Sequence, residues 1–260
     1  MTEGKRLEKE IELDASVDEV WEAVSTGQGF ATWFVPHDIK TDENGVPVVA
    51  EGDFGSGNTD QGRLLEWEPK RRVKFGNYSS DSTQVLEFLV EGKDSGSTVL
   101  RLVQSGAQGE DWEMEYHSKG WDLFFQNLRE YLEYFRGKPV ANALVMSFTT
   151  VDAKTVWERM YAALGANRDL AVGDLVELTP KGVEPIKGTV DIAVPGAVLG
   201  VRTEDGLYRF GGQGADAWGM VNAFHYRYGT DVDPAEWTER WQRWINEVFP
   251  PSEAPQAQPA

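Results

Sequence analysis

The stretch that decides the fold is residues 62–72, GRLLEWEPKRR, because an altered copy returns at residues 188–198 as GTVDIAVPGAV. Each copy has a glycine, a short alternating apolar run, a proline seven positions after the glycine, and a second apolar run. The triplet Val-Trp-Glu precedes both copies, at residues 20–22 and 156–158, and an aromatic segment follows each. The order helix, strand, proline turn, strand, helix therefore occurs twice, which predicts one fold present in two copies.

The elements around the first copy follow from apolar spacing. Residues 5–13 alternate and predict a strand, and residues 14–16 can cap a helix whose inner face carries Val17, Val20, Trp21 and Val24. Further along, the sequence predicts a short helix at 28–34, extended segments joined by a turn at 42–45, and strands at 61–68, 72–78, 83–91 and 98–104. Strands joined by short turns favour an antiparallel sheet.

One face of this sheet is expected to be apolar. Its predicted residues are Leu65, Trp67, Val73, Phe75, Leu86, Phe88, Val90, Leu100 and Leu102. A helix at 117–136 is expected to cover that face, because apolar residues recur along it at helical spacing. Gly137, Lys138 and Pro139 end this helix and predict a domain boundary.

The second copy repeats the pattern in shortened form. The sequence predicts a helix at 153–164, a last helix opening at Asp233-Pro234, and strands at 143–149, 175–179, 188–194, 197–202, 207–210 and 217–226. The counterpart of the short helix around Trp33 is expected to be deleted. The predicted division is a first domain at 1–138, a degenerate second domain at 139–250, and a disordered tail at 251–260.

Composition narrows the classes of function. The net charge is −18, so nucleic acid and anionic membrane surfaces are disfavoured partners. The chain has no cysteine, its start carries no signal-peptide pattern, and no apolar run reaches membrane-spanning length. We therefore expect a cytoplasmic protein without membrane insertion.

Four runs together resemble a known superfamily: IELDASVDEVWEAVSTGQGFATWF, GRLLEWEPKRRVKF, STVLRLVQSG and HSKGWDLFFQNLREYLE. They look like START-like (SRPBCC) proteins, in the branch named for the C-terminal domain of the Hsp90 ATPase activator. The resemblance covers about residues 5–137, and a weaker, degenerate form of the same pattern covers residues 143–249. It implies an α+β helix-grip fold, in which a curved antiparallel sheet wraps a long C-terminal helix, here present twice. In many members the cavity between sheet and helix binds an apolar molecule.

A ligand cavity in the first copy is one of two interpretations of its aromatic residues. The expected lining is Trp33, Phe34, Trp67, Phe75, Phe88, Trp112, Tyr116, Trp121 and Phe125. The alternative is that these side chains fill the core completely.

Signals for catalysis are weak, and we predict no catalytic residue, no metal site and no cofactor. His37, His117 and His225 do not form a helical zinc motif, and no Gly-x-Ser-x-Gly occurs. His37 is interpreted as a solvated loop residue, although a general-base role near the cavity mouth is an alternative. His117 is expected at the start of the final helix, and the acidic residues 110–115 in a solvated loop.

Three hypotheses follow. The first is non-catalytic binding of a small apolar molecule by the first domain. The second is a chaperone-linked or regulatory module that binds a protein partner. The third is a cyclase-like or hydrolytic enzyme, which requires polar groups converging inside the cavity.

Overall fold

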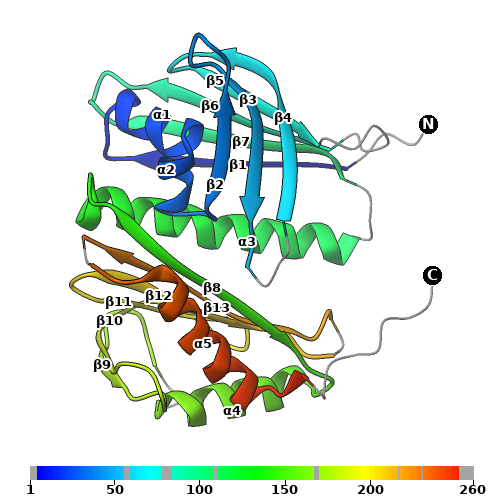
Figure 1. The fold of residues 1–260 in the computed structure, drawn as a ribbon, viewed down its shortest axis with the longest axis vertical. Helices are drawn as coiled ribbons and strands as arrows, with labels where there is room; N and C mark the ends of the chain where they lie inside the picture. The colour runs from blue at the N-terminus through cyan, green and yellow to red at the C-terminus, as the bar shows by residue number, and fades with distance from the viewer. Residues whose placement is uncertain are drawn as a thin grey trace. The chain divides into compact units, whose positions relative to one another are not determined.

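The chain forms two compact units, Met1–Pro139 and Val140–Ala260. The computed structural model describes residues 5–55, 59–77, 84–107, 111–166, 170–215, 217–229 and 231–251. The predicted disordered tail therefore lies, from residue 252 on, outside the described residues. Each unit is an antiparallel sheet with helices, so the α+β helix-grip fold predicted from the sequence is present twice (Figure 1).

The first unit has a seven-stranded sheet in the order β1-β7-β6-β5-β4-β3-β2. Its elements in chain order are β1 (Lys5–Leu13), α1 (Val17–Ser25), α2 (Gly27–Ala31), β2 (His37–Thr41), β3 (Pro47–Asp53), β4 (Thr59–Glu68), β5 (Arg72–Asn77), β6 (Val85–Gly92), β7 (Thr98–Ala107), α3 (Asp111–Glu130) and the π-helical turn η1 (Tyr131–Phe135).

The apolar face of this sheet is largely as predicted. Val73, Phe88 and Leu102 align across β5, β6 and β7 and are fully buried. Leu65 is an exception, because its side chain is 45% exposed. The pairing of β4 with β5 shifts register between Leu64 and Glu66, and such a bulge turns one residue away from its expected face.

The closing helix begins earlier than the sequence indicated. α3 starts at Asp111, so His117 lies inside the helix, and residues 111–115 are helical instead of forming a loop. Acidic residues suit a helix N-terminus as well as a solvated loop, so composition did not separate the two. The helix ends in the π-helical turn η1.

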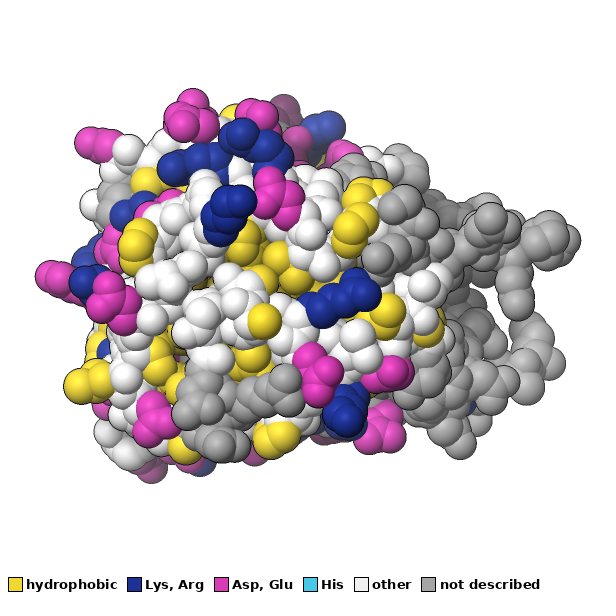
Figure 2. Space-filling model, turned by 90° about the horizontal axis from the view of Figure 1, so that it is seen from below, with side chains coloured by type: hydrophobic (Ala, Val, Ile, Leu, Met, Phe, Trp, Pro, Cys, Tyr) yellow, Lys and Arg dark blue, Asp and Glu magenta, His cyan; other side chains and the backbone are white. Residues whose placement is uncertain are grey.

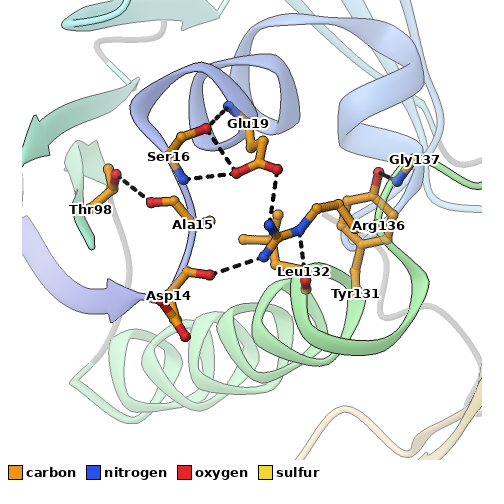
Figure 3. Close-up of polar contacts among 9 residues, drawn as sticks. All are labelled: Asp14, Ala15, Ser16, Glu19, Thr98, Tyr131, Leu132, Arg136 and Gly137. Atoms are coloured by element: carbon orange, nitrogen blue, oxygen red, sulfur yellow. Dashed lines mark hydrogen bonds and ion pairs between the residues drawn. The ribbon is translucent and has the colours of Figure 1, made fainter. Parts of the chain in front are cut away.

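Arg136 joins the end of this helix to the start of α1 (Figure 3). Its Nη1 donates to Oε1 of Glu19 at 3.0 Å, and its Nη2 donates to the main-chain oxygen of Asp14 at 3.0 Å. Glu19 also completes a capping box with Ser16, and the hydrogen bond from the Ser16 N–H is the main reason why the pKa of Glu19 is lowered. This latch fixes the C-terminal end of the closing helix against the turn that follows β1.

The second unit has a six-stranded sheet in the order β8-β13-β12-β11-β10-β9. Among the residues described between the first helix and β9, none is helical, which agrees with the predicted loss of the short helix. Its elements are β8 (Val140–Phe148), α4 (Ala153–Leu164), β9 (Leu175–Leu178), β10 (Ile186–Val194), β11 (Val198–Arg202), β12 (Gly206–Gly212), β13 (Met220–Tyr228) and α5 (Pro234–Val248).

The core of the second unit lies between its sheet and α5. Trp237, Trp241 and Trp244 point inward from α5, as their spacing predicted, and are at most 3% exposed. His225 of β13 is fully buried among these rings, and its ring centroid is 4.2 Å from that of Trp241. Burial, with a smaller contribution from the charge of Arg209, lowers the pKa of His225 to about 3.

The glycine that marks the repeat has a different packing role in each unit. A Cβ at Gly188 would stand 2.2 Å from the main-chain oxygen of Arg202, which is far inside contact distance. A Cβ at Gly62 would meet its nearest atom, the main-chain oxygen of Gly76, at 3.4 Å. The close approach of strands β10 and β11 therefore requires glycine in the second copy, whereas the first copy leaves room for a methyl group.

Gly188→Ala should lower the free energy of unfolding by about 1–3 kcal/mol, because the new methyl group must push two strands apart. Gly62→Ala is the matched control and should change it by less than about 1 kcal/mol. Urea unfolding of the full chain, followed by tryptophan fluorescence, measures both. Equal effects of the two substitutions would contradict the assigned packing.

The buried His225 predicts a pH-dependent stability. Its pKa is near 6.5 in the unfolded chain and about 3 when folded, so between these values only the unfolded chain takes up the proton. Stability is complete above pH 6.5 and falls by about 1.4 kcal/mol per unit below it. Wild type should lose about 2 kcal/mol more between pH 7 and pH 5 than His225→Gln in urea unfolding. Parallel pH profiles would show that His225 is not desolvated.

Candidate functional site

Trp33 anchors a group of aromatic side chains inside the first unit. Its side chain is fully buried, and its indole N–H donates to the main-chain oxygen of Ala23 in α1 at 2.9 Å. Its own main-chain oxygen accepts from Nδ2 of Asn127 in α3 at 3.2 Å, and Asn127 is also fully buried. Two hydrogen bonds therefore fix Trp33 between the first helix and the closing helix.

Rings from the sheet, the α2 segment and α3 meet around this anchor. We call this group the aromatic cluster; its members are Phe30, Trp33, Phe34, His37, Phe54, Phe75, Phe88, Trp121, Phe124 and Phe125. The deep part is closely packed: Phe30 and Phe88 have ring centroids 5.7 Å apart and are at most 1% exposed.

The other part of the cluster surrounds Phe34. Its ring lies 4.6 Å from that of Phe124, 5.0 Å from that of Trp121 and 5.7 Å from that of Phe54. Phe54 and Phe124 are only half-buried, so this part reaches toward solvent. The indole N–H of Trp121 donates to Oε1 of Gln104 at 3.0 Å, which places a half-buried amide beside the rings.

The structure brings together most of the side chains that the sequence singled out. Trp33, Phe34, Phe75, Phe88, Trp121 and Phe125 all belong to the aromatic cluster. Trp67 instead packs against Trp21 of α1, with ring centroids 4.9 Å apart. The side chains of Trp112 and Tyr116 lie outside the described residues.

Sequence reasoning did not assign several members of the site. Phe30 and Phe124 were placed in helices but not in the cavity lining, and their aromatic character within apolar stripes was the available signal. Phe54, Gln104 and Asn127 carried no local signal, because their place depends on how distant elements meet. Figure 3 shows the latch that holds two of these elements, α1 and the closing helix, together.

The three histidines have different surroundings. His37 lies on β2, half-buried, with its ring stacked 4.5 Å from that of Phe30 and its Nδ1 2.8 Å from the main-chain oxygen of Val35. The interpretation of His37 as a solvated loop residue is therefore wrong, because the ring covers Phe30. His117 is half-buried within α3, and His225 belongs to the second core. Among the described residues, no group of three or more His, Asp or Glu side chains is arranged to hold a metal ion.

Charges of both signs lie on the face shown in Figure 2. On the face shown in Figure 2, acidic and basic side chains are interspersed around exposed apolar ones, without a single acidic patch. Beside the aromatic cluster, Lys9 of β1 pairs with Asp122 of α3 at 2.6 Å. In the described part of the chain, no helix is long and apolar enough to span a bilayer.

Comparison with protein families identifies the first unit. The family described as Activator of Hsp90 ATPase homolog 1-like protein matches residues 14–133, so the first unit is similar to that family over most of its length. The match confirms the resemblance predicted from the sequence and ends within the first unit. No curated protein matches the chain in a sequence search.

Several solved structures resemble the chain at low sequence identity. The Aha1 dimer from Colwellia psychrerythraea is 17% identical, with 50% of this chain and 96% of that chain covered and a TM-score of 0.42. BexL, a di-domain ARO/CYC protein of the BE-7585A biosynthetic pathway, is 17% identical over 98% and 100% of the two chains, with a TM-score of 0.43. DynU16, from the dynemicin biosynthetic locus, is 19% identical over 95% and 96%, with a TM-score of 0.43. Likeness at this level transfers no activity or substrate.

The anchoring of Trp33 predicts a specific stability effect. Asn127→Leu removes a buried donor and leaves the main-chain oxygen of Trp33 without this bond, so the free energy of unfolding should fall by about 1–3 kcal/mol. Gln104→Leu is the matched control, since water can replace a half-buried amide beside Trp121, and should cost less than about 1 kcal/mol. Urea unfolding of each variant checks the difference. A larger cost for Gln104→Leu would contradict the assigned role of Asn127.

Proposed function

We propose that the first unit binds a small apolar molecule at the solvent-facing part of the aromatic cluster, between its sheet and α3. The observation that carries this proposal is that four rings from three separate segments meet: those of Phe34, Phe54, Trp121 and Phe124. Two of these rings, Phe54 and Phe124, are only half-buried. Rings that meet edge to face and reach solvent offer flat apolar surface to a ligand. The resemblance to START-like proteins supports a ligand site at the same place, between the sheet and the closing helix.

The proposed site has a polar handle as well as apolar walls. Oε1 of Gln104 holds the Trp121 indole, and the amide nitrogen of Gln104 can donate to a polar atom of the ligand. The deep part of the cluster would act as a fixed floor, because Phe30, Trp33 and Phe88 are buried and closely packed. An apolar molecule with one acceptor group fits this arrangement.

We infer that binding occurs without chemistry. The buried or half-buried polar side chains that hold Trp33 and Trp121 are amides, Asn127 and Gln104, and an amide neither takes up nor releases a proton at ordinary pH. General acid–base catalysis needs a titrating group in reach of the substrate, and these amides cannot supply one. His37 is the titratable member of the cluster, and its Nδ1 lies 2.8 Å from the main-chain oxygen of Val35, so His37 is the residue through which any turnover would act.

The neutral fluorescent probe N-phenyl-1-naphthylamine tests the site in the full chain. We expect one saturable site, and Phe124→Ala should weaken binding at least about fivefold, because it removes one wall, as the loss of about 1 kcal/mol would do. Tyr161→Ala on α4 of the second unit is the matched control and should leave the affinity unchanged. Native mass spectrometry should show one probe per chain.

The outcome that would contradict the proposal is an affinity that Phe124→Ala leaves unchanged. Trp121→Ala should also weaken binding of the probe, although it should in addition destabilise the unit by roughly 3–5 kcal/mol. Stability is therefore measured beside affinity, and Trp121→Phe, which keeps a ring, separates lost folding from lost binding.

A second candidate function is a chaperone-linked interaction module in the cytosol, favoured by the family match over residues 14–133. A stable stoichiometric protein partner recovered from cytosol, with no effect of the apolar probe on its capture, would favour this function over the first.

A further inference from the structure

The sheet of the second unit has one strand fewer than that of the first, and the difference lies at the edge formed by β9 (Figure 1). In the first unit, Gly62 of the repeat pairs with Ala50 of β3, and β2 pairs with the other side of β3. In the second unit, Gly188 of the repeat pairs with Val176, so β9 is the counterpart of β3. The described part of the second sheet ends at β9 and has no counterpart of β2.

Two residues of β9, Leu175 and Glu177, turn their main-chain groups toward this edge. The N–H of Val190 donates to the main-chain oxygen of Asp174 at 2.9 Å, so Asp174 and every second residue after it face β10. The residues between them therefore direct their N–H and C=O groups away from β10. Among the described residues, none forms a main-chain hydrogen bond with Leu175 or Glu177 on that side.

The first unit shows what covers the corresponding edge. Counted from the glycine of each repeat, Glu177 corresponds to Glu51 of β3, and Asp38 of β2 lies opposite Glu51. The far side of β2 is covered in turn, because a Cβ at Gly27 of α2 would stand 2.3 Å from the main-chain oxygen of His37. Neither β2 nor α2 has a counterpart among the residues described between α4 and β9.

The side chains at this edge are unusually exposed for apolar residues. Leu175 is 86% exposed and Val172 is 66% exposed, the two highest values among the large apolar side chains of the described residues. Edge strands that resist pairing usually carry lysine, proline or a bulge. β9 has the sequence LVEL, in which Glu177 is the one charged residue, so it retains few of these safeguards.

We propose that β9 is a docking edge, to which an extended segment of another protein adds as an antiparallel strand. The segment would take the position that β2 has in the first unit, and its main chain would pair with Leu175 and Glu177. Opposite Glu177 it carries Lys or Arg, and opposite Leu175 and Val176 it carries apolar side chains. The proposal does not depend on the ligand site of the first unit, because it concerns the main chain at the edge of the other sheet.

Charge favours a basic partner over a second copy of this chain. The carboxylate of Glu177 pairs with Lys187 at 3.0 Å, and both side chains are more than half exposed, so a basic residue of the docked strand can share it. Two copies of β9 would instead bring Asp174 and Glu177 of both chains to one edge. Each chain also carries a net charge of −18, which opposes self-association.

A synthetic peptide tests the docking edge in the full chain. The peptide acetyl-HKIVT-amide keeps the pattern of β2, whose sequence is HDIKT, but places lysine opposite Glu177 and valine opposite Leu175. In ¹H–¹⁵N NMR titrations, we expect saturable shifts of the Leu175 and Glu177 amide signals and slower exchange of both amides with water. The control peptide carries N-methyl groups on its lysine and valine, the residues that would face β9. It should bind at least about tenfold more weakly, because it loses two main-chain hydrogen bonds.

Two variants at one position complete the test. Leu175→Pro removes the N–H that faces the edge without removing a donor to β10, and it should abolish binding of the peptide. Leu175→Thr keeps the N–H and should weaken binding by at most about fivefold, since only a side-chain contact is lost.

Equal affinity of the two peptides, shifts confined to residues outside β9, or no binding at all would overturn the proposal. Sedimentation that shows dimers, which Leu175→Pro disperses, would also overturn it, because a second copy would then occupy the edge. The comparison of the two peptides on the wild-type chain decides the matter even where Leu175→Pro fails to fold.

Discussion

Each unit depends on one constraint: the apolar face of an antiparallel sheet must be covered by the helix that ends that unit. A sheet with one dry face is not stable in water by itself, and a single amphipathic helix with large aromatic side chains can cover it. In the first unit, the latch of Arg136 on Glu19 and Asp14 fixes the end of the closing helix (Figure 3). In the second unit, the buried tryptophans of α5 provide the cover.

The two copies use the enclosed space differently. In the first unit, rings fill the deep part around Trp33 and Phe88, while the rings around Phe34 reach solvent. In the second unit, His225 lies buried among the tryptophans of α5, which fill the space between sheet and helix. The same arrangement of strands and helices therefore encloses interiors that are packed differently in the two units.

Local sequence patterns predicted those helices and strands whose ends are determined by neighbouring residues. The strand at 5–13 and the helix at 153–164 agree with β1 and α4, because alternation and an aspartate cap define their ends. Features that depend on contacts between distant parts of the chain could not be predicted from local sequence patterns. The bulge that exposes Leu65 and the pairing of Trp67 with Trp21 follow from strand register and helix position. For the same reason, Phe54, Gln104 and Asn127 could not be assigned to the candidate site from the sequence.

The central claim is that each closing helix packs inside its own unit, with its aromatic side chains against the residues of that unit's sheet and early helices. Aromatic NOESY spectra of the folded full chain, with tryptophan, phenylalanine and histidine selectively labelled, test it most directly. This packing predicts cross-peaks between the rings of Trp121 and Phe34, whose centroids are 5.0 Å apart, and between those of Trp241 and His225, whose centroids are 4.2 Å apart. Absence of both from a folded chain, with these tryptophans in contact with other rings instead, would contradict it.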